Sequence, residues 1–130
     1  MFLVGHSVGC IAILRYLEQL KDNEKVGGVV FVAGFTDDLS NVDSIEGELK
    51  NFFETPILWD KLKAKANKYV VIHSDNDPYV SRKYGDVFKE KLGAKLIVKK
   101  NMGHFSGEVD NSKSVTSLPD VIREIQEMSK

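Results

Sequence analysis

The length, composition and charge of the chain limit what it can be. It has 130 residues, of which 42% are hydrophobic and 28% charged, a balance that fits one soluble globular domain over residues 1–130. Its 18 basic and 19 acidic residues give a formal net charge of −1, with no long run of either sign. These features exclude the basic surface that nucleic acids or anionic membranes require, so partners must be recognised through a local site.

The single cysteine and the first residues indicate the compartment. Cys10 has no partner for an internal disulfide and no metal-ligand spacing around it, so the composition fits a reducing compartment and predicts a cytoplasmic protein. Residues 1–6 (MFLVGH) lack the basic segment of a signal peptide and the apolar length of a membrane span. They resemble a buried strand without its beginning.

The first half of the chain predicts two strands and an amphipathic helix. Residues 2–4 (FLV) form a short β-type run, and apolar residues recur at helical spacing from Val8 to Leu20. The valine-rich run over 26–35 is almost continuously apolar, which is typical of a strand buried on both faces of a parallel sheet. Residues 36–58 form a polar excursion in which we expect a helical stretch over 45–53.

The second half repeats the strand-helix pattern. It predicts helices over 59–66, 80–92 and 117–125, and strands over 69–73 and 95–98. Gly93 should end the second of these helices, while Ser117 and Pro119 should begin the third. Alternating strands and helices imply an α/β fold with a mostly parallel sheet and flanking helices, because crossover connections place the helices on its faces. Ligands of such sheets lie at the carboxyl ends of the strands.

Residues 5–9 (GHSVG) form a G-x-S-x-G pattern between a predicted strand and a predicted helix, which is the context of a nucleophile elbow. In such an elbow Ser7 occupies a strained turn, and its hydroxyl stands above the sheet as the nucleophile. The flanking Gly5 and Gly9 should give the strand and the helix space to pass closely. The Val8 backbone N–H, at the start of the helix, is a candidate oxyanion-hole donor.

A serine nucleophile needs a base. Its hydroxyl is weakly nucleophilic at neutral pH unless an adjacent base, oriented by a third group, removes the proton. His104 is the best candidate, since it lies in a glycine-containing loop just after the last predicted strand. His6 is adjacent to Ser7, but its side chain should point away from the nucleophile and have a structural role. His73 ends a strand and should be buried and hydrogen-bonded.

The orienting acid has four candidates. Asp75 and Asp77 follow one predicted strand, and Asp37 and Asp38 follow the strand before it. Asp77 ranks first, because it lies where the loop turns into the next helix and because α/β-hydrolases have the chain order Ser, Asp, His. Asp75 could instead stabilise its turn by accepting hydrogen bonds from backbone N–H groups.

Other conspicuous residues have simpler interpretations. Cys10, three residues after Ser7, is best explained as a small core residue. Trp59, Phe52 and Phe53 are candidates for lining an acyl pocket, although buried aromatic residues more often belong to the core. The sequence contains no pattern for a metal, nucleotide or flavin site, so no cofactor is predicted.

Six segments together resemble the small serine hydrolases related to retinoblastoma-binding protein 9 and the bacterial predicted esterases of the same group. These segments are GHSVG at 5–9, VAGFTDD at 32–38, PILWDKLK at 56–63, VIHSDNDPYV at 71–80, NMGHF at 101–105 and TSLPDVI at 116–122. The resemblance implies a compact α/β-hydrolase with little or no cap, in which nucleophile, acid and base fall on Ser7, Asp77 and His104.

The resemblance also implies a segment that this sequence does not contain. Similar proteins carry further strand-helix units before the elbow strand, whereas this chain starts at that strand. We therefore expect an α/β-hydrolase fold that lacks its N-terminal strands and the loop with the second oxyanion-hole donor. The strand over 2–4 should then have an exposed edge, which can pair with another chain.

The sequence supports functions of two different kinds. The first is a serine hydrolase that acts on ester or amide bonds of a small molecule or peptide through an acyl-enzyme. The second is a non-catalytic module that binds a protein partner or a second copy through its strand edge, or an inactive fragment of a hydrolase. An acyltransferase is a narrower alternative, since G-H-S-x-G also occurs in carrier-protein transacylases, but Asp77 followed by His104 favours a hydrolase.

Overall fold

A parallel four-stranded sheet forms the centre of the protein. The structure, a computed structural model, describes residues 1–37, 50–105 and 118–130. The strands are β1 (Phe2–His6), β2 (Val26–Val32), β3 (Ala66–Ser74) and β4 (Lys95–Lys99). They pair in parallel in the order β1-β2-β3-β4, so their carboxyl ends lie at one edge of the sheet. The predicted parallel sheet is confirmed.

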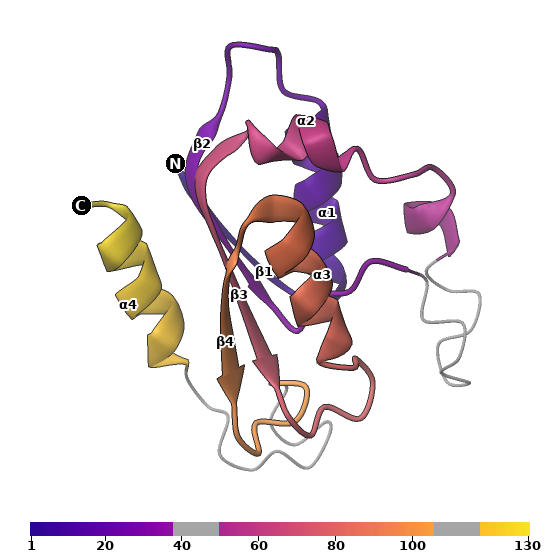
Figure 1. Ribbon diagram of the computed structural model, residues 1–130, viewed down its shortest axis with the longest axis vertical. Coiled ribbons are helices and arrows are strands. Elements are labelled where there is room, and N and C mark those ends of the chain that lie inside the picture. Colours follow the sequence, from indigo (N-terminus) through magenta and orange to yellow (C-terminus); the bar gives the residue numbers. More distant parts are fainter. Residues whose placement is uncertain (38–49, 106–117) are drawn as a thin grey trace.

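Helices cover both faces of this sheet (Figure 1). On one face lie α1 (Val8–Glu18), α2 (Trp59–Lys63) and α3 (Lys83–Leu92), and on the other lies α4 (Pro119–Met128). A short 3-10 helix over Lys50–Phe53 precedes α2. Within the described segments, every helix is too short or too polar to cross a membrane.

Alternation along the strands divides the core into two layers. In β2, Val29 and Phe31 belong to the layer that contains side chains of α1 and α3, and the Phe31 ring stacks on Phe88 with a centroid distance of 4.8 Å. Val30 and Val32 belong to the layer that packs against α4. Because both faces of β2 are buried, apolar side chains are favoured at every position, which explains its continuous apolar sequence.

Two helices are shorter than the sequence predicts. α2 ends before Ala66, because Ala66 pairs with Val26 and already belongs to β3. α3 begins at residue 83 rather than 80, because the Asp77 carboxylate accepts hydrogen bonds from the N–H groups of Tyr79 and Val80 and holds them in a turn. In both places a hydrogen bond to a distant or capping group overrides helix propensity.

Two residues mark helix ends as the sequence predicts, although α4 continues three residues beyond the predicted end at residue 125. Gly93 follows α3 in the left-handed conformation with a φ of 68°, and Pro119 lies in the first turn of α4, as predicted. The expected cap Ser117 lies outside the described residues. The helical stretch expected over 45–53 is a 3-10 helix in its last four residues, and 45–49 lie outside the described part of the chain.

Ion pairs join α4 to β4. The Lys95 ammonium lies 2.9 Å from Glu124 Oε1, and the Lys99 ammonium lies 3.0 Å from Asp120 Oδ2. Both carboxylates are buried, and the hydrogen bond from Lys99 is the largest of the effects that lower the pKa of Asp120. These pairs fix the helix along the edge strand, in addition to its apolar contacts with the sheet.

His73, near the end of β3, is buried without a hydrogen-bond partner. The side chain is fully buried, and among the described residues neither ring nitrogen has a partner of good geometry. The prediction of a hydrogen-bonded His73 is therefore wrong. Burial lowers the pKa of His73 to about 4, while Asp77, Asp86 and the Gly34 backbone act in the opposite direction. The ring is neutral at neutral pH.

Acid should destabilise the protein through His73. The unfolded chain binds this proton near pH 6.5 and the folded chain only near pH 4, so the stabilising contribution is complete above pH 6.5 and is lost as the pH falls. We expect His73 to account for a loss of about 2 kcal/mol in the free energy of unfolding between pH 7 and pH 5. Urea unfolding at both pH values should show a correspondingly smaller loss in His73→Leu. Equal losses in the two proteins would contradict this assignment.

Candidate active site

Three side chains meet at the carboxyl edge of the sheet. Ser7 lies between β1 and α1, Asp77 between β3 and α3, and His104 in the loop after β4. The Nε2 atom of His104 lies 2.8 Å from Ser7 Oγ, and its Nδ1 atom lies 2.8 Å from Asp77 Oδ2. The structure thus brings together the three residues chosen from the sequence, in one hydrogen-bonded chain from hydroxyl through imidazole to carboxylate.

Ser7 has a backbone conformation that residues other than glycine rarely adopt. Its φ is 58° and its ψ is −121°, which gives a sharp turn between β1 and the first turn of α1. The Ser7 N–H donates to the Val32 carbonyl oxygen at 2.9 Å, so the turn is anchored to β2. Such strain persists only where the surrounding structure holds it, and it is concentrated at functional sites.

Packing at this turn requires only one of the two flanking glycines. A Cβ atom on Gly5 would lie 2.8 Å from Ile13 Cδ1 and 3.0 Å from the Cys10 backbone nitrogen. A Cβ atom on Gly9 would meet nothing within 4 Å in the described structure. The prediction that both glycines give the strand and helix space to pass closely is confirmed for Gly5 and wrong for Gly9.

The two oxygens of the Asp77 carboxylate have different partners. Oδ2 bonds the His104 ring, whereas Oδ1 accepts hydrogen bonds from the N–H groups of Tyr79 at 2.8 Å and Val80 at 2.9 Å. The Asp77 side chain is only 1% exposed. Its orientation is therefore fixed from both sides, and its bond to the imidazole is protected from water.

The other candidate acids have different partners. Asp75 Oδ1 accepts a hydrogen bond at 3.0 Å from the N–H of Asn101, so it bonds the loop after β4 rather than its own turn. The Asp37 carboxylate accepts a 2.7 Å hydrogen bond from the Tyr84 hydroxyl, and Asp38 lies outside the described residues. Of the candidate acids, the structure places Asp77 on the His104 ring.

His6 contacts the backbone of the candidate base. Its Nε2 donates to the His104 carbonyl oxygen at 2.6 Å, and the two ring centroids are 5.0 Å apart. The contact supports the predicted structural role of His6. The Tyr79 ring also meets the His104 ring, edge-on at 5.3 Å. Sequence reasoning missed both contacts, because nothing in the spacing of these residues signals them.

Cys10 is a buried core residue, as predicted. It is fully buried in α1, and its Sγ lies 3.6 Å from the Val32 carbonyl oxygen. Burial raises the pKa of the Cys10 thiol to about 12, so the thiol remains protonated at neutral pH. Because the thiolate is the reactive form of cysteine, this environment disfavours a nucleophilic role.

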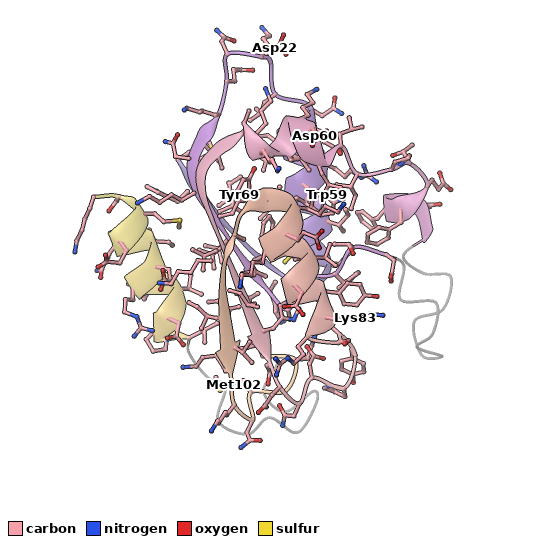
Figure 2. The ribbon with its side chains drawn as sticks, in the orientation of Figure 1. Asp22, Trp59, Asp60, Tyr69, Lys83 and Met102 are labelled. Carbon is pink, nitrogen blue, oxygen red and sulfur yellow. The ribbon has the colours of Figure 1, made fainter. Side chains whose placement is uncertain are left out.

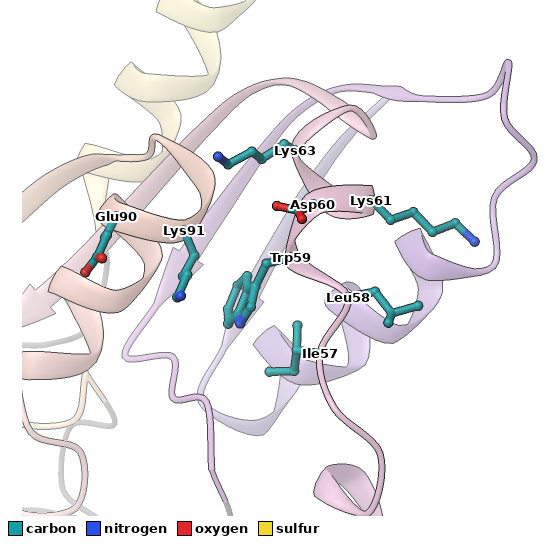
Figure 3. A pocket seen from close by; sticks show the side chains of 8 residues that line it. All are labelled: Ile57, Leu58, Trp59, Asp60, Lys61, Lys63, Glu90 and Lys91. Carbon is teal, nitrogen blue, oxygen red and sulfur yellow. The ribbon is translucent and has the colours of Figure 1, made fainter.

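Two of the aromatic residues considered for an acyl pocket line hollows that the three site residues do not border. Phe53 and Trp59 line a hollow of about 390 Å³, and Trp59 also lines one of about 630 Å³ beside Lys91 of α3 (Figure 3). Ser7, Asp77 and His104 line neither hollow. Trp59 and Met102 lie towards opposite ends of the sheet (Figure 2). Phe52 is 40% exposed, so it is not part of the core.

The arrangement supplies a hydroxyl with an oriented base. In the segments described, no three His, Cys, Asp or Glu side chains are grouped to hold a metal ion. The His104 imidazole can take the Ser7 proton while the Asp77 carboxylate orients the ring and stabilises its positive charge. These are the requirements for nucleophilic attack by a serine.

The fold and sequence match known proteins. Residues 1–125 match the Serine hydrolase family. The chain is 31% identical over 120 residues to YdeN of Bacillus subtilis (strain 168), and 28% identical over 126 residues to the serine hydrolase RBBP9 of Rattus norvegicus. The crystal structure of the B. subtilis ydeN gene product matches with a TM-score of 0.83 at 30% identity and covers 99% of this chain. The chain therefore belongs to the serine hydrolase family and has an α/β-hydrolase-like fold.

These relatives are longer than the chain. The match to YdeN covers 92% of this chain but 59% of YdeN, and the match to RBBP9 covers 97% of this chain but 60% of RBBP9. The chain spans 66% of the ydeN crystal structure. It thus spans about three fifths of the curated relatives, so activity, substrate and partners do not follow from the match alone.

Alanine substitutions at the two glycines test the packing around Ser7. The methyl group of Gly5→Ala should displace Ile13 or the backbone of α1 and lower the free energy of unfolding by about 1–3 kcal/mol. Gly9→Ala is the matched control: its methyl group has space, and its higher helix propensity should leave stability unchanged or raise it by up to ~1 kcal/mol. Thermal unfolding compares both variants with the wild type. Equal stability of the two variants would show that Gly5 is not required by packing.

Proposed function

We propose that this chain carries the catalytic residues of a hydrolase that cleaves ester or amide bonds through an acyl-enzyme. Ser7 is the nucleophile, His104 the general base and acid, and Asp77 the orienting carboxylate. The observation that carries the proposal is the pair of 2.8 Å hydrogen bonds that join Ser7, His104 and Asp77. The sharp turn at Ser7 between β1 and α1 supports its role as a nucleophile elbow. Membership of the serine hydrolase family supports the same chemistry.

The reaction has two stages. In the first, His104 Nε2 takes the hydroxyl proton as Ser7 Oγ attacks the substrate carbonyl carbon, and the tetrahedral intermediate then expels an alcohol or amine that receives this proton. In the second, water attacks the acyl-enzyme and gives a proton to His104, which returns it to Ser7 as the carboxylic acid leaves. Throughout, Asp77 keeps Nε2 directed at Ser7 and stabilises the imidazolium.

The Val8 backbone N–H is the proposed donor to the oxyanion. Val8 follows Ser7 directly and is the first residue of α1. The first N–H groups of a helix have no acceptor within the helix and lie at the positive end of its dipole. One such donor stabilises the transition state of acyl transfer by about 3 kcal/mol.

The order of the sheet supports a second candidate function. β1 pairs with β2 and has no second strand partner within the described residues, and Val4 of β1 is 47% exposed. A strand edge of this kind can accept an extended segment of another chain through backbone hydrogen bonds. In this alternative the chain binds a protein or a second copy through β1. A monomer that persists at all concentrations in size-exclusion chromatography, without complexes, would argue against it.

Covalent labelling by a fluorophosphonate probe tests the hydrolase proposal. The probe reacts with an activated serine oxygen, so we expect labelling of the wild type and none of Ser7→Ala. Ser129→Ala, which removes an exposed serine after α4, is the matched control and should label like the wild type. Circular dichroism should show that all three proteins are equally folded. Equal labelling of Ser7→Ala, or no labelling of the folded wild type, would rule out the proposed chemistry.

A further inference from the structure

Hydrogen bonds join the loop that carries Asp77 to the loop that carries His104. Three successive side chains accept from three successive backbone N–H groups, and the donor–acceptor pairs are Asn101–Asp75 at 3.0 Å, Met102–Ser74 at 3.0 Å and Gly103–Asn76 at 2.8 Å. We call these three pairs the loop clamp. In the reverse direction, the Asp75 N–H donates to the Lys99 carbonyl oxygen at 3.0 Å. The two loops are thereby fixed relative to each other just before the acid and the base.

The loop that carries His104 includes a strained residue. Asn101, Gly103 and Phe105 have φ values of 56°, 55° and 58°. Glycine and asparagine adopt this left-handed conformation readily, whereas at Phe105 it costs about 1–2 kcal/mol. Residues 101–105 therefore keep their shape because neighbouring groups hold them. The loop clamp provides such groups, since it supplies acceptors to three consecutive N–H groups of this segment.

Asn76 lies at the centre of the loop clamp. Its Oδ1 accepts one hydrogen bond from the Gly103 N–H at 2.8 Å and another from the Ser74 hydroxyl at 2.7 Å. Because the Gly103 N–H can only donate, the amide oxygen of Asn76 and not its nitrogen must face it. Ser74 is only 1% exposed, whereas Asn76 is exposed. Asn76 can therefore be replaced without opening the core.

We propose that Asn76, supported by Ser74, is a positioning residue that holds the His104 imidazole between Ser7 and Asp77. This inference rests on the proposed hydrolase function. Gly103 directly precedes His104, so its hydrogen bond to Asn76 fixes the peptide from which the imidazole projects. Asn76 directly precedes Asp77, so the same side chain ties the base to the backbone of the acid.

The alignment of the base should depend on this contact. Without an acceptor at residue 76, the Gly103 N–H and the Ser74 hydroxyl turn to other partners, and the strained loop relaxes. A displacement of about 1 Å at a reacting group costs on the order of 100-fold in rate. Because Asn76 acts through His104 and not through the substrate, its loss should lower kcat and leave KM unchanged.

Three variants of the full chain test the proposal, assayed by hydrolysis of p-nitrophenyl acetate and by thermal unfolding. Asn76→Ala removes the acceptor, and we expect kcat to fall roughly 10- to 100-fold at constant KM. Asn76→Asp keeps an acceptor and should recover most of kcat. Glu124→Ala breaks the ion pair with Lys95 at the opposite end of β4 and is the destabilised control.

The kcat values of these variants decide whether Asn76 positions His104. A wild-type kcat in Asn76→Ala would overturn the proposal. An equal loss of kcat in Glu124→Ala at a matched loss of melting temperature would also overturn it, because the effect would then be one of general stability. Loss in Asn76→Ala, recovery in Asn76→Asp and full kcat in Glu124→Ala support the positioning role.

A spectroscopic readout separates this inference from the proposed function. In the wild type, the Nδ1 proton between His104 and Asp77 should give a low-field proton resonance, which Asn76→Ala should broaden or remove and Asn76→Asp should retain. An unchanged resonance in Asn76→Ala would overturn the positioning role whether or not the chain hydrolyses esters. The chain could instead show neither hydrolysis nor probe labelling while the resonance still depends on Asn76. That combination would reject the hydrolase function and support the positioning of the ring.

Discussion

Parallel pairing of the four strands is the constraint on which the rest of the structure depends. Because the strands run in one direction, the turns that follow β1, β3 and β4 all emerge at the same edge, and each carries one residue of the candidate site. Hydrogen bonds from these turns to the sheet and to one another then fix their positions. The Ser7 N–H is anchored on β2, and the two loops around the His104 ring are joined by side chains of residues 74–76. The sheet therefore brings the three site residues to one edge, and the hydrogen bonds between the loops set the distances between their side chains.

Much of this arrangement can be predicted from the sequence, because its signals are periodic or chemical. The valine-rich run over 26–32 predicts a buried strand, and G-x-S-x-G between a strand and a helix places Ser7 at a turn. The order of Ser7, Asp77 and His104 along the chain then selects the residues that the structure brings together. Helix boundaries are less predictable, since the start of α3 depends on which backbone groups the Asp77 carboxylate binds.

The sequence does not reveal side-chain contacts between segments that are far apart along the chain. Residues 74–76 form a polar, turn-like sequence, and nothing local indicates that their side chains bond a loop 25 or more residues away. Within the described residues the buried His73 ring has no hydrogen-bond partner, although buried polar groups usually find one. Gly9 occupies the last position of the G-x-S-x-G pattern, yet only the described structure around it reveals that a Cβ atom has space there. Each of these depends on tertiary neighbours that are distant in sequence.

The separation of 97 residues between Ser7 and His104 has a consequence for biosynthesis. A chain emerging from the ribosome presents the serine first, and the serine remains without its imidazole until β4 and the loop after it have been made and have joined the sheet. If Ser7 is the nucleophile that we propose, nascent chains should therefore not react with esters or with covalent serine inhibitors. On the same proposal, the hydroxyl becomes reactive only after segments 97 residues apart have come together, so the onset of probe labelling would report their assembly.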